Sequence, residues 1–364
     1  MIKIKPRFKE LKEQNLPNSK DMAKKYKHKE IIKLNYNESK FGFTPNLNGA
    51  IEIKSPNIYP EFRDHPLIDK LSENFDLSKE HFYVSNGSDA ILEAIPTLFA
   101  SARKEHNVLV PELTFGRIQT TCLVNDVETK KIKLVDGKIS LKETLKAIDE
   151  NTRIIYIVNP NMPTGTYNNE NEMIEFLEKV PNNILVVVDG AYSEFVEGID
   201  KSIEIDKKLI ERFDNVLITH TFSKMYGLAS FRIGYAIARP YIIEIFDKAL
   251  QALPINKYSL QAATIALNDK QFYMNVIEQV WAEKEFLYSE YDRLGLKYLK
   301  TTGNFIFIDT KDKEFTNKEI REFILTDSGV MIRCVRDFGL RITIGTHKEN
   351  LMLINSMEKF LNEK

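Results

Sequence analysis

Short, uninterrupted runs of apolar residues, rich in Val and Ile, recur through the middle of the 364-residue chain. They are NVLVP at residues 107–111, RIIYIV at 153–158, NILVVVD at 183–189 and NVLIT at 215–219. Such runs, with β-branched side chains and no polar alternation, are typical of strands buried on both faces. Helix-like stretches such as SLKETLKAIDE and NENEMIEFLEKV separate them. This alternation predicts an α/β fold in which helices cover a mostly parallel sheet.

Polar residues follow three of these runs. RIIYIV leads into NPNMPTG, NILVVV into DGAY, and NVLIT into HTFSK. In open α/β sheets, ligands bind just beyond the carboxyl ends of the strands. We therefore expect one crevice to gather the polar side chains of Asn161, Asp189, Tyr192, Ser223 and Lys224.

The pattern of the chain changes near Pro240. A long helical region is followed there by two expected strands, NFIFID and RITIG, an order typical of a smaller α+β domain. The N-terminal segment is expected to pack with this domain, because neither piece is large enough to hold a core alone. We predict an N-terminal segment at residues 1–45, a large cofactor-binding domain at 46–245 and a small C-terminal domain at 246–364.

Charge and cysteine content narrow the class of protein. Lys and Arg number 51 against 52 Asp and Glu, so no long-range field is expected to attract nucleic acid or an anionic membrane. The two cysteines, Cys122 and Cys334, match neither a disulfide framework nor a zinc site, and the six histidines have no metal-ligand spacing. No signal peptide or membrane-spanning run is visible. We predict a cytoplasmic protein without a metal, a nucleic-acid partner or a membrane.

The run THTFSKMYGLASFRIGY at residues 219–235 places one lysine among hydroxyls and small residues. A solvated surface charge is the ordinary interpretation of such a lysine. A reactive lysine needs a lowered pKa, which desolvation and a neighbouring cation supply. The apolar residues after Lys224 and the cation Arg232 favour an amine that attacks a carbonyl carbon. Arg232 with the hydroxyls of Thr221 and Ser223 suits phosphate oxygens, although for Arg232 alone a structural salt bridge is an equal alternative.

A second anion site is predicted at YVSNGSDAILEAIPTLF, residues 83–99, where a short glycine-containing loop leads into an amphipathic helix. The backbone amides of Gly87, Ser88 and Asp89 would be unpaired donors of the first turn, where anions bind. The alternative, and the better interpretation of this stretch alone, is a helix capped by the side chain of Ser88 or Asn86.

Asp189 ends a strand that is otherwise apolar, and a buried carboxylate is costly unless a cation accompanies it. A protonated ring nitrogen would be such a cation, and a turn aspartate is the alternative. Tyr192 suits a phenolate-like oxygen or simple packing. Pyridoxal 5′-phosphate combines an aldehyde for Lys224, a phosphate for Arg232 and a ring nitrogen for Asp189, so we predict it as the cofactor.

At these residues the chain resembles the fold-type I pyridoxal-phosphate-dependent aminotransferases, and in particular their histidinol-phosphate aminotransferase branch. The resemblance covers nearly the whole chain, and the pattern TFSKxxGLAxxRxGY is highly specific to the group. The motifs are LNYNESKFGFTP (34–45), NIYPEF (57–62), VSNGSDAIL (84–92), PELTFGR (111–117), NPNMPTG (159–165), VVVDGAYSEF (186–195), THTFSKMYGLASFRIGY (219–235) and LRITIGTHKEN (340–350). The resemblance implies a large domain with a mostly parallel seven-stranded sheet, a smaller α+β domain, and a homodimer with shared active sites.

The resemblance also implies roles for single residues. Lys224 would bind the cofactor aldehyde covalently and then move a proton between two carbons, and Asp189 would pair with the ring nitrogen. Tyr192 would bond the 3-oxygen of the ring, and Phe115 would stack on the ring face. The phosphate would be held by Gly87, Ser88, Asp89, Thr221, Ser223 and Arg232, with Tyr59 reaching it from the neighbouring subunit. Arg341, Arg333 and Asn37 would bind the substrate.

The sequence departs from the family pattern near the substrate entrance. The asparagine that usually precedes Pro-Thr-Gly and bonds the ring 3-oxygen is Met162, and Asn161 is expected to take its place. The usual Asn-Pro after Asn-Glu is Ser39-Lys40, and the usual glutamate after the strand aspartate is Gly190. The connection from Arg333 to Arg341 is shorter than is common.

These features favour a transaminase that moves an amino group from glutamate to a small phosphorylated ketone. Histidinol phosphate is the family default, and another phosphorylated carbonyl compound such as dihydroxyacetone phosphate is an alternative acceptor. Decarboxylation of an amino-acid phosphate would use the same residues. A non-catalytic pyridoxal-phosphate-binding protein is the least favoured interpretation, because Lys224 and Asp189 are both present.

Overall fold

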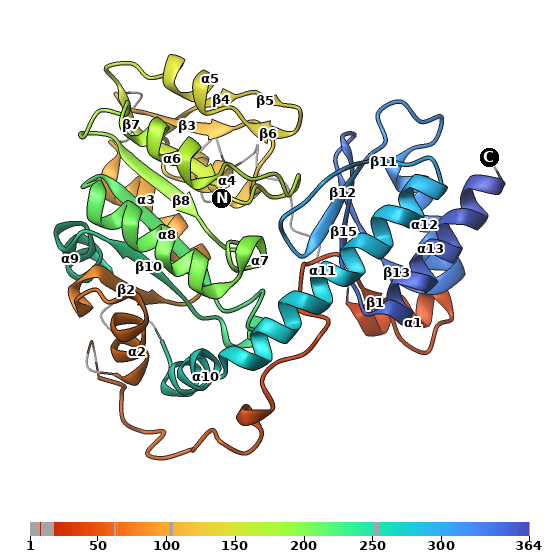
Figure 1. Ribbon diagram of the computed structural model, residues 1–364, viewed down its shortest axis with the longest axis horizontal. Coiled ribbons are helices and arrows are strands. Elements are labelled where there is room, and N and C mark those ends of the chain that lie inside the picture. Colours follow the sequence, from red (N-terminus) through yellow and green to blue (C-terminus); the bar gives the residue numbers. More distant parts are fainter. Residues whose placement is uncertain are drawn as a thin grey trace, which may run out of the picture.

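The structure, a computed structural model, describes residues 8, 18–61, 63, 65–101, 105–250 and 255–363. Figure 1 shows two groups of elements. One is a large sheet with helices around it, and the other is a small sheet with helices of its own, of which α11 (Lys270–Arg293) runs from one group to the other. The predicted α/β class, with a large sheet and a smaller α+β part, is confirmed.

The large sheet has seven strands in the order β2-β10-β9-β8-β7-β3-β4. Their bounds are Phe82–Ser85 (β2), Asn107–Pro111 (β3), Glu128–Ile132 (β4), Thr152–Val158 (β7), Leu185–Asp189 (β8), Val216–Thr221 (β9) and Gly234–Ala238 (β10). Only β10 runs against its neighbours in this sheet; the pairs from β9 to β4 are all parallel. The carboxyl ends of β3, β7, β8 and β9 therefore meet at one edge of the sheet.

Both faces of the sheet are covered, which explains the uninterrupted apolar runs. In β8, Val186 and Val188 pack on one side in a cluster with helices α6 and α8. Leu185 and Val187 pack on the other side with α3, α4 and α9. Because successive side chains point to opposite faces, a strand buried on both faces needs an apolar residue at every position.

Most helices of the large group lie between its strands along the chain. They are α2 (Pro66–Phe75), α3 (Ser88–Phe99), α4 (Gly116–Val124), α5 (Leu141–Lys146), α6 (Glu170–Leu177), α7 (Glu194–Glu197), α8 (Ile199–Arg212), α9 (Pro240–Ala249) and α10 (Lys257–Asn268). A short hairpin, β5 (Leu134–Val135) with β6 (Lys138–Ile139), lies between β4 and α5. Helix α10, which falls in our predicted small domain by sequence, packs against α2 of the large group.

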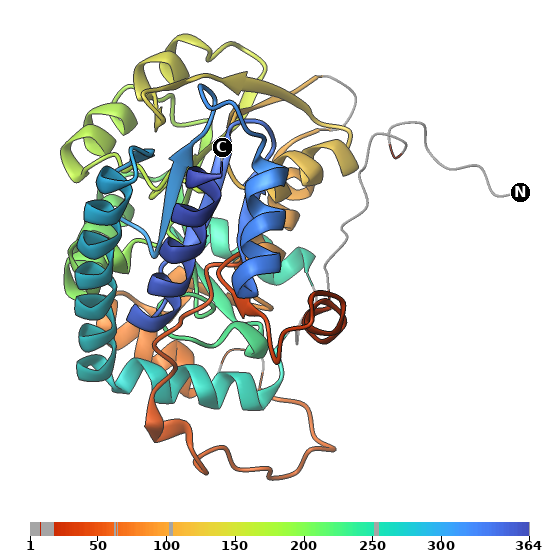
Figure 2. The same ribbon diagram turned by 90° about the vertical axis from the view of Figure 1, so that its right-hand side faces the viewer.

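The small sheet has four antiparallel strands in the order β11-β12-β15-β14. Their bounds are Lys297–Leu299 (β11), Phe305–Asp309 (β12), Arg333–Val335 (β14) and Gly339–Thr343 (β15), and helices α12 (Asn317–Ser328) and α13 (His347–Asn362) accompany them. Figure 2 shows α11, α13 and α12 side by side on this sheet. In the N-terminal segment, α1 (Ser19–Tyr26) precedes β1 (Ile32–Lys33), which pairs with β13 (Val330–Met331).

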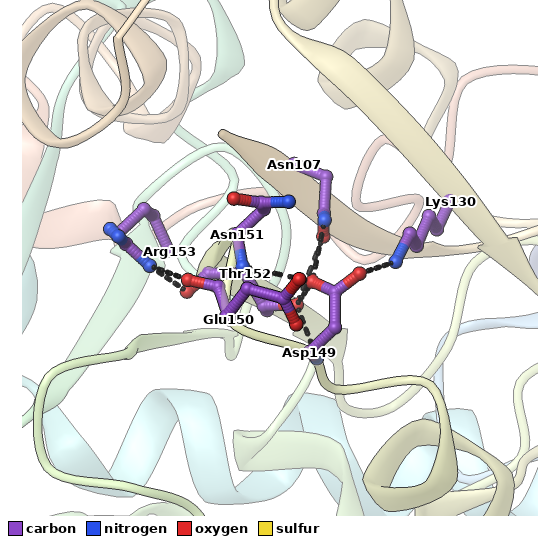
Figure 3. Close-up of polar contacts among 7 residues, drawn as sticks. All are labelled: Asn107, Lys130, Asp149, Glu150, Asn151, Thr152 and Arg153. Carbon is purple, nitrogen blue, oxygen red and sulfur yellow. Dashed lines mark hydrogen bonds and ion pairs between the residues drawn. The ribbon is translucent and has the colours of Figure 1, made fainter. Parts of the chain in front are cut away.

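A polar network closes the opposite, amino-terminal edge of the large sheet (Figure 3). The carboxylate of Asp149 accepts hydrogen bonds from the Asn107 side chain at 2.8 Å and the Thr152 hydroxyl at 3.0 Å. Lys130 forms an ion pair with the same carboxylate. These contacts tie the start of β7 to β3 and β4 at the end of the sheet away from the candidate site.

Candidate active site

A cavity of about 1100 Å³ lies at the carboxyl ends of the parallel strands. It is lined by residues of the large sheet and its loops, and by residues of β14 and β15 in the small sheet. Eleven of the residues predicted for the site line it, namely Ser88, Asp89, Phe115, Asp189, Tyr192, Thr221, Ser223, Lys224, Arg232, Arg333 and Arg341. The topology therefore brings together segments that are far apart in the sequence.

Lys224 follows β9 and extends into this cavity. Its Nζ donates a hydrogen bond of 2.9 Å to the backbone carbonyl of Tyr36. Burial lowers the pKa of Lys224 to about 8, and the positive charge of Arg341 adds to that effect more than Arg232 does. The nearby carboxylates of Asp89 and Glu38 act in the opposite direction. The amine is thus neutral more often near neutral pH than that of an exposed lysine, as a nucleophile requires.

Asp189 is 4% exposed and ends β8. Its Oδ1 accepts hydrogen bonds from the Thr219 hydroxyl at 3.2 Å and from the backbone N–H of Ala191 at 3.3 Å. Burial raises the pKa of Asp189 to about 6. No lysine or arginine among the described residues forms an ion pair with it. A buried carboxylate that lacks a cation is the expected partner of a protonated ring nitrogen, so the residue fits pyridoxal phosphate.

The first turn of α3 faces Ser223 and Arg232. Nη1 of Arg232 donates to the Ser223 hydroxyl at 3.2 Å, and Nη2 lies 3.3 Å from the Asp89 carboxylate. Gly87 precedes the helix at φ +80°, and no side chain caps the helix there. The alternative of a helix capped by Ser88 or Asn86 is therefore wrong, and the amides of Ser88 and Asp89 remain available to an anion. The Gly87 amide, which we also predicted as a donor, instead donates to the Ser85 carbonyl at 2.8 Å.

Two glycines leave room for an anion between Arg232 and the first turn of α3. A Cβ on Gly87 would lie 2.8 Å from Nη2 of Arg232, and one on Gly234 would lie 2.5 Å from the backbone nitrogen of Ser88. A side chain at Gly234 would therefore displace the backbone of the helix start, whereas one at Gly87 would push the guanidinium away. The hydroxyl of Thr221 accepts a hydrogen bond of 3.1 Å from the backbone N–H of Ser223, which fixes the loop before Lys224. The donor set and its spacing suit a phosphate group.

Tyr192 is 5% exposed, and its ring meets Phe305 of the small sheet edge-on at 5.0 Å. The side chain of Asn37 donates to its hydroxyl at 3.0 Å. Asn37 is fully buried behind the phenol and does not line the cavity, although we predicted that it binds substrate. Its side chain contacts the Tyr192 hydroxyl instead.

The structure does not bring the side chain of Asn161 to the cavity. Its Oδ1 accepts from the Thr114 hydroxyl at 2.9 Å, and its Nδ2 donates to the Leu113 carbonyl and to Thr164. Met162 lines the cavity in its place, and its sulfur lies 2.8 Å from Nη1 of Arg341. This geometry does not support the expectation that Asn161 replaces the missing asparagine.

Arg341 and Arg333 stand opposite each other on β15 and β14, so their side chains share one face of the small sheet. Arg341 is 8% exposed, and it donates to the backbone carbonyl of Asn35. Its Nε has no hydrogen-bond partner. Burial and the charge of Arg333 lower the pKa of Arg341. A buried guanidinium without a carboxylate is suited to an anionic substrate group.

The predicted site residues and the residues that line the cavity also differ at Tyr59 and at three aromatic or basic residues. Tyr59 is 80% exposed and does not line this chain's own cavity. The cavity is also lined by Tyr36, Arg117 and Arg336, which our sequence interpretation did not single out. The only sequence signal for Arg336 was a second basic residue three positions after Arg333.

The geometry defines a pyridoxal-phosphate site at the carboxyl ends of the parallel strands, where the sheet passes into loops. In agreement, residues 29–357 match the family Aminotransferase class I and II. The chain belongs to the class I and II aminotransferases, and it is a pyridoxal-phosphate-dependent transaminase of fold type I.

Curated relatives carry a more specific name. The histidinol-phosphate aminotransferase of Geobacillus thermodenitrificans is 33% identical over 350 residues, which cover 94% of both chains. That of Anoxybacillus flavithermus is 32% identical over 370 residues, covering 100% of this chain and 98% of the relative.

Solved structures agree in fold. The Sinorhizobium meliloti histidinol-phosphate aminotransferase, a complex with pyridoxal-5′-phosphate, superposes with a TM-score of 0.89 at 23% identity, covering 100% of this chain and 98% of the other. The L-threonine-O-3-phosphate decarboxylase of Porphyromonas gingivalis gives 0.77 at 20% identity, covering 91% and 100%. Among the described residues, no helix is long and apolar enough to cross a membrane.

Proposed function

We propose that this transaminase moves an amino group between glutamate and a small phosphorylated ketone, as its relatives named histidinol-phosphate aminotransferases would. The observation that carries the proposal is the pair Arg341 and Arg333. These two guanidiniums line the same cavity as Lys224, and neither forms an ion pair with a carboxylate among the described residues. Two free cations beyond the cofactor-phosphate cradle fit a substrate with anionic groups at both ends.

Pyridoxal phosphate, when bound, supplies an aldehyde that condenses with amines and a ring that draws electrons from the carbon next to nitrogen. Lys224 is the residue that would hold it covalently, because its Nζ is the buried amine of lowered pKa in the cavity. Asp189 would keep the ring nitrogen protonated. Ser223, Arg232 and the first turn of α3 would hold the phosphate.

The remaining residues orient substrate and move protons. With pyridoxal phosphate in place, the Nζ of Lys224 would act as the base that takes the proton from the α-carbon of glutamate. Arg341 would bind the α-carboxylate, because it is the cation whose charge most affects Lys224. Phe115, at the start of α4, would cover the ring face and exclude water from it.

The same residues would also serve a different acceptor or a different reaction. Dihydroxyacetone phosphate is an alternative acceptor, since Met162 and Gly190 depart from the family pattern where substrate enters. Decarboxylation of an amino-acid phosphate is the other, because one solved structure of similar fold carries that name. A transaminase converts the bound cofactor to its amine form when glutamate is added, whereas a decarboxylase leaves its absorbance unchanged.

We also infer a cytoplasmic homodimer with shared sites. The segment before α2 exposes Ile53, Ile58 and Tyr59 at 76%, 59% and 80%, more than is usual for apolar side chains of a monomer. Tyr59 would thereby reach the neighbouring subunit's phosphate. Analytical ultracentrifugation tests the dimer.

The pairing of β1 with β13 supports the proposal that residues 1–45 belong with the small domain.

The decisive experiment is a half-reaction screen. Protein loaded with pyridoxal phosphate is first converted to the amine form with glutamate, and phosphorylated ketones are then added singly. Return of the original absorbance with a phosphorylated ketone, and not with its dephosphorylated counterpart, supports the proposal. Equal rates with and without the phosphate would refute it.

A further inference from the structure

The tip of the β14–β15 hairpin places an arginine where the backbone favours glycine. The carbonyl of Val335 accepts a hydrogen bond of 3.0 Å from the N–H of Phe338, so Arg336 occupies the first central position of a tight turn. Its φ is +47°, in the left-handed region that side chains other than glycine rarely adopt. A non-glycine residue kept in such a conformation points to a function for its side chain.

The turn is held firmly against the start of α12. The Nδ2 of Asn317 donates to the backbone carbonyl of Arg336 at 3.0 Å. Asn317 is itself buried, and its Oδ1 accepts from the Thr310 hydroxyl at 2.5 Å. Cys334 contacts the carbonyl of Asn317 at 3.1 Å. The backbone from which Arg336 extends is therefore anchored on both sides.

Arg336 lines the same cavity as Arg333 and Arg341. The other cavity arginines are paired: Arg117 with Glu93, and Arg232 with Asp89. Within the part of the chain that the structure describes, Arg333 and Arg336 join no ion pair and their guanidinium groups form no hydrogen bond. The small-sheet side of the cavity thus presents three guanidiniums that lack a carboxylate partner.

We propose that Arg336 is a specificity-determining residue that binds the phosphate of the acceptor together with Arg333. The inference rests on the proposed function and names the substrate group that this corner of the site recognises. A phosphate monoester carries close to two negative charges and three acceptor oxygens at neutral pH, enough for two guanidinium forks. The side-chain carboxylate of glutamate carries one negative charge, so a single guanidinium group is enough to bind it. Arg336 therefore favours the phosphorylated partner over glutamate.

The test uses the substitution Arg336→Gly in cofactor-loaded, full-length protein. Glycine adopts the observed φ without strain, so the variant is expected to fold. We expect the apparent KM for a phosphorylated ketone to rise about tenfold, which is the usual loss for one charged hydrogen bond. The KM for glutamate should change less than twofold. Arg336→Lys restores the positive charge but not the paired N–H donors of a guanidinium, so its KM for the phosphorylated ketone should lie between those of the parent and Arg336→Gly.

Lys311→Ala is the matched control. Lys311 lies 5.2 Å from the ring of Phe338 in the same turn, yet it does not line the cavity. Its substitution removes one positive charge near the hairpin and should leave both KM values unchanged. An equal rise in the control and in Arg336→Gly would show a general charge effect and overturn the proposal.

Inhibition by inorganic phosphate gives a readout that needs no acceptor. We expect phosphate to compete with glutamate in the parent protein, and its inhibition constant to rise about tenfold in Arg336→Gly. An unchanged inhibition constant would overturn the role of Arg336, even if phosphorylated ketones react. If no phosphorylated ketone reacts with the parent while phosphate inhibition still depends on Arg336, the proposed function fails and the phosphate contact stands.

Discussion

The side-chain amide of Asn37 donates a hydrogen bond of 3.0 Å to the hydroxyl of Tyr192. Asn37 is fully buried, and its backbone N–H donates to the Thr343 hydroxyl at 2.9 Å. Its carbonyl accepts from the Asn304 side chain at 3.1 Å. The N-terminal segment, the small sheet and the large domain therefore meet at one residue, directly behind a phenol that lines the cavity.

Asn37→Ala is expected to lower kcat about tenfold, because the Tyr192 hydroxyl loses the donor that orients it and one charge-influenced hydrogen bond is worth about that factor. The pH at which the bound cofactor changes its visible absorbance should also shift, since Tyr192 would no longer be held against the ring oxygen. Asn46→Ala, at an exposed asparagine nine positions further along the chain, is the control. An unchanged absorbance titration would rule out positioning of Tyr192 by Asn37.

Lys224→Ala should abolish the visible absorbance of lysine-bound cofactor while leaving the circular dichroism of the fold intact. The substitution removes a buried amine of lowered pKa that lines the cavity. Borohydride reduction followed by peptide mapping checks the attachment point in the parent protein. Covalent label on a different lysine would contradict the assignment.

Capture of cofactor by the cofactor-free protein should depend on pH through the Lys224 amine. Its pKa is lowered to about 8, and the neutral form attacks, so the rate should rise about tenfold between pH 7 and pH 9 and then level off. Arg341→Ala removes a positive charge that lowers this pKa. The profile of that variant should move to higher pH. A coincident profile in stopped-flow absorbance would exclude the electrostatic coupling.

Asp189→Asn is expected to have opposite effects on activity and on stability. Activity should fall by about a hundredfold or more, since a buried charge pair with the ring nitrogen is worth about 3–5 kcal/mol. The cofactor-free variant should melt at a higher temperature than the parent above pH 6. The pKa of Asp189 is raised to about 6 in the native state, whereas the carboxyl ionises near pH 4 in the unfolded chain, so the parent alone loses stability as the pH rises from about 4 to 6 and stays destabilised above that. Calorimetry of cofactor-free samples at pH 5 and pH 7.5 measures the difference, and a lower melting temperature for the variant at pH 7.5 would contradict it.

Asp149→Asn should lower the melting temperature without changing kinetics, because its network lies at the far edge of the sheet (Figure 3). Lys130 and the Asn107 side chain hold the pKa of Asp149 well below its usual range. The ionised form therefore stabilises the native state above pH of about 4, and this contribution is lost as the pH falls further. The difference in melting temperature between the two proteins should shrink over that acidic range. A difference that stays constant with pH would show that the charge is not responsible.

The sequence by itself determined the fold class, and it predicted most of the residues that the structure gathers around the candidate site. Strands such as β8 need an apolar residue at every position because both faces are covered, and this pattern is visible without a structure. The position of Asp189 and Lys224 at strand ends then places them together, since parallel strands end at one edge.

Only the tertiary structure decided which side chains face the cavity. Thr114 and Thr164 engage the amide of Asn161, so Met162 fills the position beside Arg341. Arg341, more than one hundred residues from Lys224, influences the pKa of that lysine more than Arg232 does. Contacts of this kind depend on side-chain directions between segments distant in sequence, and hydrophobic periodicity carries no information about them.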